Sequence, residues 1–269
     1  DAVRERAARS MPENAFEMHS VSFGYERGTR VLKDINLAVP AGKVTALIGP
    51  NGCGKTTAFA LLSRIYRPAS GKILFFGRDI SAIPRREYAQ SVAAVHQYNT
   101  VPDDMTVREL VAMGRTAYHN VFFSHSTQAD LDAAERAMEE TRTSAFAERR
   151  VKELSGGQMQ RVWLALAMAQ TDRALLLDEI TTYLDVHYQL EMLGLIRSLN
   201  ERHGTTVLMV LHDVNQTLRY ADHVIMMKEG GVLAAGAPDE VITDGMLRET
   251  YGVQAQIARV SDRKICIFG

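Results

Sequence analysis

The sequence has few cysteines and no long hydrophobic run. Its two cysteines, Cys53 and Cys266, form neither a Cys-x-x-Cys pair nor a cluster with histidines. Small secreted domains are usually held by several disulfides, so we predict two free thiols and a reducing compartment. Apolar runs such as residues 44–48 and 207–211 are far shorter than the roughly 18 to 20 residues of a membrane-spanning helix. The chain is therefore not predicted to cross a bilayer by itself.

An excess of charge of one sign is also missing. The sequence carries 31 Lys and Arg against 32 Asp and Glu, a net charge of -1, so it offers nucleic acid no overall electrostatic attraction. The first residues, DAVRERAARSMPEN, are charged and lack the apolar segment of a secretory signal. A hydrophobic content of 46% is sufficient for a packed core. We expect residues 1–15 to be a flexible extension, residues 16–255 a single domain and residues 256–269 a C-terminal tail.

The strand signals predict an α/β fold. Residues 16–23 and 31–39 alternate between apolar and polar side chains and are separated by a turn, which indicates an antiparallel β region. Residues 44–48 and 174–177 are short apolar runs typical of buried strands. A helix-like segment, residues 189–200, separates the second run from the next apolar run, a spacing that suits a parallel βαβ unit.

A mostly helical insert is predicted for residues of about 98–165. Within it, Thr106 stands three residues before Glu109 and Thr127 three residues before Asp130, the spacing of an N-terminal capping box. The aromatic-rich connector TAYHNVFFSHST lies between these two helix starts, and we expect a buried loop there.

The stretch GPNGCGKTT, residues 49–57, contains the phosphate-binding pattern G-x-x-x-x-G-K-[S/T]. Glycine has no Cβ, so the backbone of such a loop can curl and direct several N–H groups at a phosphate. Lys55 would supply a positive charge for the β- and γ-phosphates, and Thr56 a hydroxyl oxygen for Mg²⁺. The helix that follows would turn its positive end toward the anion. This context favours a phosphate site over a glycine turn with a chance lysine.

Two carboxylates, Asp178 and Glu179, follow the apolar run 174–177. A carboxylate at the end of a buried strand is costly unless it is paired, and Mg²⁺ is a natural partner for Asp178. Glu179 could polarise an attacking water molecule. Alone, the pair would indicate a solvated strand end, whereas together with the phosphate loop it indicates a hydrolytic site.

A second anion site is predicted at LSGGQ, residues 154–158, just before a helix-like segment. Free N–H groups of Ser155, Gly156 and Gly157 at a helix N-terminus would bind a phosphate. The alternative interpretation is an ordinary serine N-cap followed by flexible glycines.

Together these stretches resemble the ATP-binding cassette (ABC) ATPases, the nucleotide-hydrolysing subunits of transporters, over residues of about 16 to 253. GPNGCGKT is similar to the Walker A loop, LLLDE to the Walker B strand and LSGGQMQR to the family signature. Tyr25 resembles the aromatic residue that stacks on adenine, and Gln97 resembles the Q-loop glutamine. Residues 183–185 resemble the D-loop, and His212 resembles the switch histidine.

The resemblance implies a P-loop NTPase fold of the ABC ATPase type, a RecA-like core with an antiparallel β subdomain and a helical subdomain insert. It implies ATP hydrolysis with Mg²⁺ by two copies of the chain that sandwich two ATP molecules. Glu179 would act as the general base, and His212 would contact the γ-phosphate. The partner would be an integral membrane permease, with a substrate-binding protein acting through it. The chain would then lie peripherally on the cytoplasmic face of the cell membrane.

By the same resemblance, a larger set of residues is assigned to the site. The nucleotide would be bound by Tyr25, Gly49, Asn51, Gly52, Cys53, Gly54, Lys55, Thr56, Thr57, Gln97, Ser155, Gly156, Gly157, Gln158 and Asp185. Mg²⁺ would be held by Thr56, Gln97 and Asp178. Considered alone, His212 would be more typical of a structural histidine and Tyr25 of a hairpin cap.

Two positions depart from the family pattern. Ile180 and His96 stand where the family often has proline, after Glu179 and before Gln97 respectively. Ile180 leaves its φ unrestricted and adds a backbone N–H, which would alter the aim of the glutamate. We expect hydrolysis to be retained but slower.

Several phrases are similar to ATPases that serve the uptake of iron chelates: DMTVRELVAMGR, TTYLD, VLHDVNQTLRYADHVIMMKEG and LRETYGV. We therefore expect import of a ferric siderophore, with haem or cobalamin as alternative cargoes. A soluble ABC ATPase acting on ribosomes or DNA is the alternative class, and the lack of sustained heptads stands against it. A small-molecule kinase with the same loop would leave LSGGQ and His212 unexplained.

Overall fold

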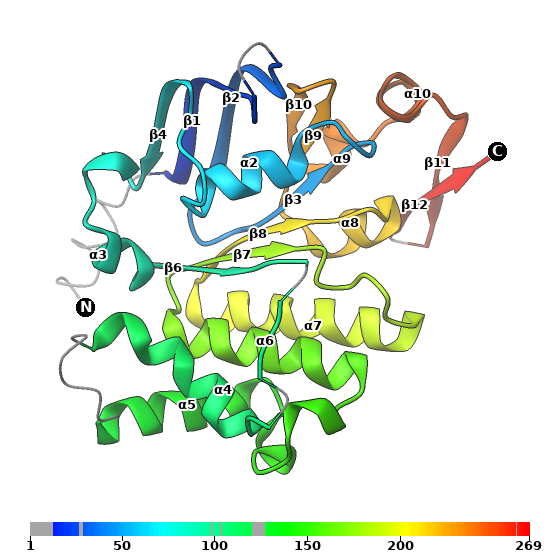
Figure 1. Cartoon of the computed structure of the whole chain (residues 1–269). Coiled ribbons are helices and arrows are strands. Elements are labelled where there is room, and N and C mark those ends of the chain that lie inside the picture. The colour runs from blue at the N-terminus through cyan, green and yellow to red at the C-terminus, as the bar shows by residue number, and fades with distance from the viewer. Residues whose placement is uncertain (1–12, 27–28, 98, 103, 120–126, 262) are drawn as a thin grey trace, which may run out of the picture. The chain divides into compact units, whose positions relative to one another are not determined.

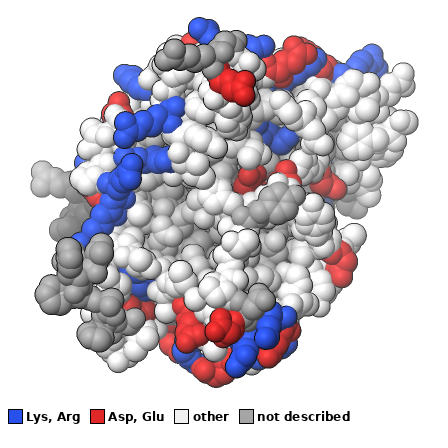
Figure 2. Space-filling view, in the orientation of Figure 1, with Lys and Arg blue, Asp and Glu red and all other residues white. Residues whose placement is uncertain are grey.

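The structure is a computed structural model that describes residues 13–26, 29–97, 99–102, 104–119, 127–261 and 263–269. It divides into two compact units, the first made of residues 1–83 and 212–269 and the second of residues 84–211. None of the described helices combines the length and the apolar character needed to span a bilayer. Acidic and basic side chains both reach the face shown in Figure 2, in keeping with the balanced charge of the sequence.

The first unit begins with the antiparallel sheet that the alternating pattern predicted. Its strands, in spatial order, are β2 (Leu32–Pro40), β1 (Asn14–Phe23), β4 (Ser70–Phe75) and β5 (Arg78–Asp79) (Figure 1). Phe16 of β1 is fully buried and packs on Phe75 of β4, with ring centroids 4.9 Å apart. Since β1 begins at Asn14, the end of the predicted extension belongs to a strand. Residues 1–12 lie outside the described residues.

A pair of parallel strands frames the predicted phosphate loop in the same unit. β3 (Val44–Ile48) is buried along its whole length and runs parallel to β9 (His223–Lys228). β10 (Gly231–Gly236) pairs antiparallel with β9. α2 (Lys55–Leu62) begins directly after the loop, so the expected order of strand, loop and helix is confirmed.

The C-terminal part of the first unit forms short helices and a hairpin. The helices are α8 (Val214–Tyr220), α9 (Pro238–Val241) and α10 (Asp244–Tyr251). The stretch expected as a tail contributes most of an antiparallel hairpin of β11 (Ala255–Val260) and β12 (Arg263–Phe268). The Asn215 side chain of α8 donates to the Cys266 carbonyl (3.1 Å) and accepts from the Cys266 N–H (2.7 Å), which fastens the hairpin.

The second unit contains the predicted parallel βαβ arrangement. β7 (Ala174–Asp178) and β8 (Thr206–Val210) are parallel and fully buried, and α7 (Val186–His203) connects them. β6 (Val92–Val95) pairs in parallel with β7 and was not predicted. Its sequence, VAAV, is too short an apolar run to stand out in a pattern.

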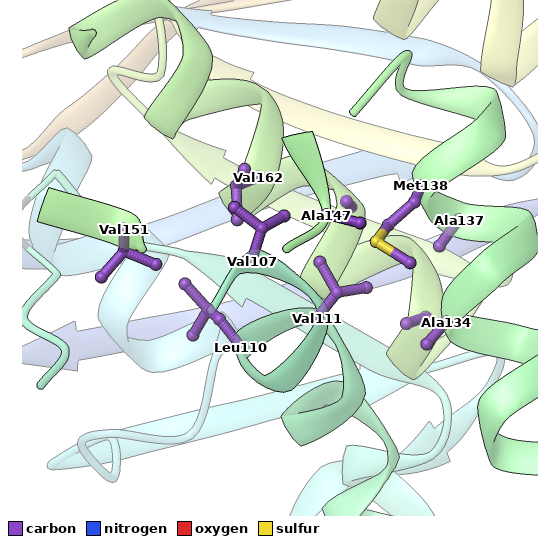
Figure 3. Packing of buried hydrophobic residues seen from close by; sticks show 11 residues of the cluster. Val107, Leu110, Val111, Ala134, Ala137, Met138, Ala147, Val151 and Val162 are labelled. Carbon is purple, nitrogen blue, oxygen red and sulfur yellow. The ribbon is translucent and has the colours of Figure 1, made fainter. Parts of the chain in front are cut away.

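Helices of the second unit pack around a shared apolar core (Figure 3). These helices are α4 (Val107–Ala112), α5 (Gln128–Glu140) and α6 (Gly156–Gln170). Both capping boxes are confirmed. The hydroxyls of Thr106 and Thr127 each accept from the backbone N–H three residues later, and the carboxylate of that later residue accepts from the backbone N–H of the threonine. Residues 120–126 of the aromatic connector, where we expected a buried loop, lie outside the described residues.

Leu110→Ala tests this core. Leu110 is 1% exposed, and removing its buried methyl groups should lower the free energy of unfolding by about 2 to 5 kcal/mol. Leu131→Ala on α5 is the matched control, because Leu131 is 42% exposed and its truncation should cost less than about 0.5 kcal/mol. Hydrogen exchange of α4 and α5 in urea would measure both. Equal losses in the two variants would contradict the packing in Figure 3.

Candidate nucleotide site

The loop between β3 and α2 requires glycine at several positions. Gly49, Gly52 and Gly54 have φ of 148°, 77° and 104°, values that side-chain-bearing residues rarely adopt. A Cβ on Gly49 would lie 2.2 Å from the Met227 carbonyl oxygen, and one on Gly54 would lie 2.6 Å from the Leu32 side chain. The glycines therefore permit both the curl of the loop and its close approach to neighbouring strands.

Lys55 lies across this loop. Its side chain is buried, and its ammonium donates to the carbonyl oxygens of Gly49 (2.7 Å) and Pro50 (3.0 Å). No side chain caps the N-terminus of α2, so its first N–H groups are directed at the loop without a competing acceptor side chain. A buried ammonium beside an uncapped helix N-terminus is an arrangement suited to a phosphate. These contacts support the phosphate site that the motif predicted.

Three more loop residues differ in exposure and therefore in what they can contact. Thr56 is exposed, whereas Thr57 is buried. Burial raises the pKa of the Cys53 thiol by more than the neighbouring Lys55 lowers it, so the thiol is protonated at neutral pH. Thr56 is thus the hydroxyl that a bound cation could reach, while the Cys53 thiol stays neutral beneath the loop.

Tyr25 lies beside the loop, as its predicted role requires. Its hydroxyl is 3.0 Å from the Thr57 hydroxyl oxygen, and its ring is edge-on to Phe23 and Tyr66 with centroids 5.2 and 5.5 Å away. The side chain is nevertheless 57% exposed, so a ring surface is open to a ligand. The sequence did not predict Tyr66, because nothing in its local pattern distinguishes it from a surface tyrosine.

In the second unit, Glu179 is held in a defined orientation. It follows the end of β7 with φ of 53°, in the left-handed region, while Asp178 is buried with 2% exposure. The Oε2 atom of Glu179 accepts from the Gln97 amide (2.7 Å) and from the Thr182 hydroxyl (3.3 Å). The structure thus brings together Glu179 and Gln97, which are far apart in the sequence. It also adds Thr182, which its position three residues after Glu179 could have indicated.

A turn explains how Ile180 can occupy the position after Glu179 where the family often has proline. The Thr182 N–H donates to the Glu179 carbonyl oxygen (3.0 Å), which closes a turn with Ile180 in its second position. Proline is favoured at the second position of such a turn because its fixed φ suits the turn, but other residues are also accepted there. Ile180 is instead held by burial, with 2% exposure. Before Gln97, His96 takes the place of the other proline, and burial lowers its pKa so that it is neutral at pH 7.

The second predicted anion site differs from expectation in one respect. The Ser155 N–H is not free, because it donates to the Gln158 side chain (3.1 Å) while the Ser155 hydroxyl accepts from the Gln158 N–H (3.3 Å). This capping box is the alternative that the sequence left open, and it arises because glutamine occupies the third helical position. Gly157 lies against the Tyr188 ring, where a Cβ would approach to 3.1 Å.

The remaining predicted residues have visible local roles. Asp185 caps α7 by accepting from the Tyr188 N–H (3.0 Å), and Tyr183 is 83% exposed. His212 lies two residues beyond the end of β8. The proposed Mg²⁺ ligands offer hydroxyl, amide and carboxylate oxygens, the donor chemistry that Mg²⁺ prefers. Because Thr56 belongs to the first unit and the other two ligands to the second, their joint use remains a prediction.

The described geometry agrees with the comparisons to known proteins. The model of the ABC transporter family matches residues 32–182, and the chain belongs to this family. It is 41% identical over 245 residues to the iron(3+)-hydroxamate import ATP-binding protein FhuC of Bacillus subtilis (strain 168), covering 91% of this chain and 90% of that protein. It is 40% identical over 237 residues to the ferric enterobactin transport ATP-binding protein FepC of Escherichia coli (strain K12), covering 88% and 87%.

Solved structures give the same result. An ABC transporter in an inward-facing conformation contains a chain that matches with a TM-score of 0.82 and 27% identity, covering 96% of this chain and 97% of that chain. The expectations of family, ABC ATPase fold and activity are therefore confirmed. The protein binds ATP and hydrolyses it as the nucleotide-binding subunit of an ABC transporter.

Gly49→Ala tests the loop geometry. The new Cβ would clash with the Met227 carbonyl, so the loop must shift and ATP affinity should fall at least about tenfold, or about 1.4 kcal/mol. Gly194→Ala on α7 is the matched control, since a Cβ there meets nothing within 4 Å, its φ is not positive and it lies outside the proposed site. Titration with a fluorescent ATP analogue would measure both variants. The loop geometry would be refuted by a Gly49→Ala protein that binds as tightly as Gly194→Ala.

Proposed function

We propose that this ATPase energises the uptake of a ferric siderophore across the cytoplasmic membrane. The observation that carries the proposal is identity of about 40% along nearly the whole chain to ATP-binding proteins named for ferric hydroxamate and ferric enterobactin transport. No residue of an ATPase subunit needs to touch the cargo, so the proposal rests on this likeness and on the phrases that first indicated it. The chain would act peripherally on the cytoplasmic face, bound to an integral membrane permease that receives cargo from a substrate-binding protein.

The working form in this proposal is a pair of chains that close over two ATP molecules. The triphosphate of each ATP would contact the loop at residues 49–56 of one copy and the signature at residues 155–157 of the other. A γ-phosphate shared between two anion sites draws the copies together, and its hydrolysis weakens that attraction. The start of α7 supplies exposed surface for such a pairing, since Val186 is 70% exposed and Tyr188 of the same turn lies against Gly157 of the signature.

Hydrolysis would depend on the orientation of Glu179. Its carboxylate polarises the attacking water, while Gln97 and Thr182 hold one of its oxygens and limit its rotation. Lys55 and the α2 amides stabilise the negative charge of the phosphates. Mg²⁺, with Thr56, Asp178 and Gln97 as its proposed ligands, supplies charge neutralisation at the β- and γ-phosphates when bound. A movement of Gln97 imposed by the permease would change the hold on Glu179, which couples transport to hydrolysis.

Glu179→Gln is expected to lower kcat for ATP hydrolysis by about 10² to 10⁴ while ATP binding is retained, because a general base is lost but no phosphate contact is. Glu201→Gln on α7 is the matched control, since its exposed side chain pairs with Arg197 one helical turn away and lies outside the proposed site. Ile180→Pro should hydrolyse ATP as fast as the parent or faster, because the turn already suits proline. Undiminished hydrolysis by Glu179→Gln would exclude it as the base.

Transport itself tests the cargo. Vesicles that contain the chain and its permease should accumulate radiolabelled ferric siderophore with ATP, and vesicles with Glu179→Gln should not. Haem or cobalamin accumulation in place of the siderophore would keep the importer and change its cargo. Failure to copurify with any membrane permease would favour a soluble ABC ATPase and contradict the proposal.

A further inference from the structure

The C-terminal end of α10 is fastened to β9 by consecutive residues. The Lys228 ammonium donates to the Glu249 carbonyl oxygen (2.6 Å). The Thr250 hydroxyl donates to the Met226 sulfur at 2.7 Å in a buried contact. These contacts hold the end of α10, which includes the next residue, Tyr251, against the same strand.

β9 in turn lies against the start of the phosphate loop. Met226 pairs in register with the last residue of β3. The carbonyl of the following residue, Met227, leaves no room for a Cβ on Gly49. The Gly230 N–H, just after β9, donates to the Cys53 carbonyl oxygen (3.1 Å). A side chain packed against β9 near Met226 and Met227 therefore lies beside the phosphate loop.

The Tyr251 hydroxyl is buried at this junction. Its oxygen is screened from solvent, and the groups that act on its pKa besides burial are the Cys53 thiol and the Gly49 backbone N–H. Burial raises the pKa of Tyr251 to about 12, the thiol adds to the rise and the Gly49 N–H opposes it, so the phenol is neutral at physiological pH. Among the described residues this oxygen completes no hydrogen bond of full geometry, an arrangement that is costly for a buried polar atom.

We propose that Tyr251 is a positioning residue for nucleotide binding, whose hydroxyl supports Gly49 from the β9 side and completes a hydrogen bond to its N–H when the loop closes on a phosphate. The inference rests on the proposed role of residues 49–56 as the phosphate loop. Tyr251 acts through the backbone of that loop and touches no substrate. Phenylalanine would fill nearly the same volume, so the hydroxyl is the group whose role can be isolated.

Tyr251→Phe should raise KM for ATP about three- to tenfold and leave kcat within about twofold, the effect of losing one neutral hydrogen bond that supports binding. Amide hydrogen exchange of residues 49–54 should become faster in the same variant, a readout that does not depend on catalysis. Tyr220→Phe is the matched control, because Tyr220 of α8 is also largely buried in the first unit and lies outside the proposed site. It should change neither KM nor the exchange of the loop.

Lys55→Ala distinguishes a failure of the proposed role of Tyr251 from a failure of the phosphate-loop assignment. Loss of ATP binding in Lys55→Ala, together with the expected effects of Tyr251→Phe, supports both. Loss of ATP binding in Lys55→Ala with Tyr251→Phe indistinguishable from Tyr220→Phe overturns the role of Tyr251 alone. Unchanged ATP binding in Lys55→Ala overturns the loop assignment and the inference with it. A Tyr251→Phe protein with lower thermal stability but unaltered KM and loop exchange would show a merely structural tyrosine.

Discussion

The close approach of the phosphate loop to β9 is the constraint on which the nucleotide site depends. A Cβ at Gly49 would lie 2.2 Å from the Met227 carbonyl oxygen, so the loop can turn out of β3 only with glycine at this point. Once the loop is seated there, Lys55 can reach the carbonyl oxygens of residues 49 and 50, and α2 begins with its uncapped N-terminus directed at the loop. The positive charge and the backbone donors of the site thus follow from one steric fit.

The second unit orders the Glu179 carboxylate, the proposed general base, by a different principle. Glu179 sits in a left-handed conformation that costs free energy, and the turn to Thr182 and the amide of Gln97 compensate by fixing the side chain. Such an arrangement keeps the carboxylate oriented before substrate arrives, so no free energy is spent on ordering it during the reaction. It also links the orientation of Glu179 to the segment that carries Gln97.

The signature at residues 155–158 shows how one short motif can stabilise a helix start and still be proposed as a binding site. The Ser155–Gln158 capping box satisfies N–H groups that would otherwise lack partners at the start of α6. Of the two glycines between them, Gly156 is exposed, whereas Gly157 is buried against the Tyr188 ring. Helix capping and the proposed anion recognition would therefore use neighbouring backbone groups of the same turn, which is why the sequence alone supported both interpretations.

The sequence by itself determined the phosphate loop, the order of its flanking strand and helix, the capping boxes at Thr106 and Thr127, and the family, because these depend on residue types at short fixed spacings. Only the tertiary structure decided that Gln97 binds Glu179, that Tyr25 meets Thr57 and that the Tyr251 hydroxyl is buried. β6 also escaped prediction, since four apolar residues become a strand only beside β7. Contacts between distant segments depend on how the elements pack, and no local pattern in the chain encodes that packing.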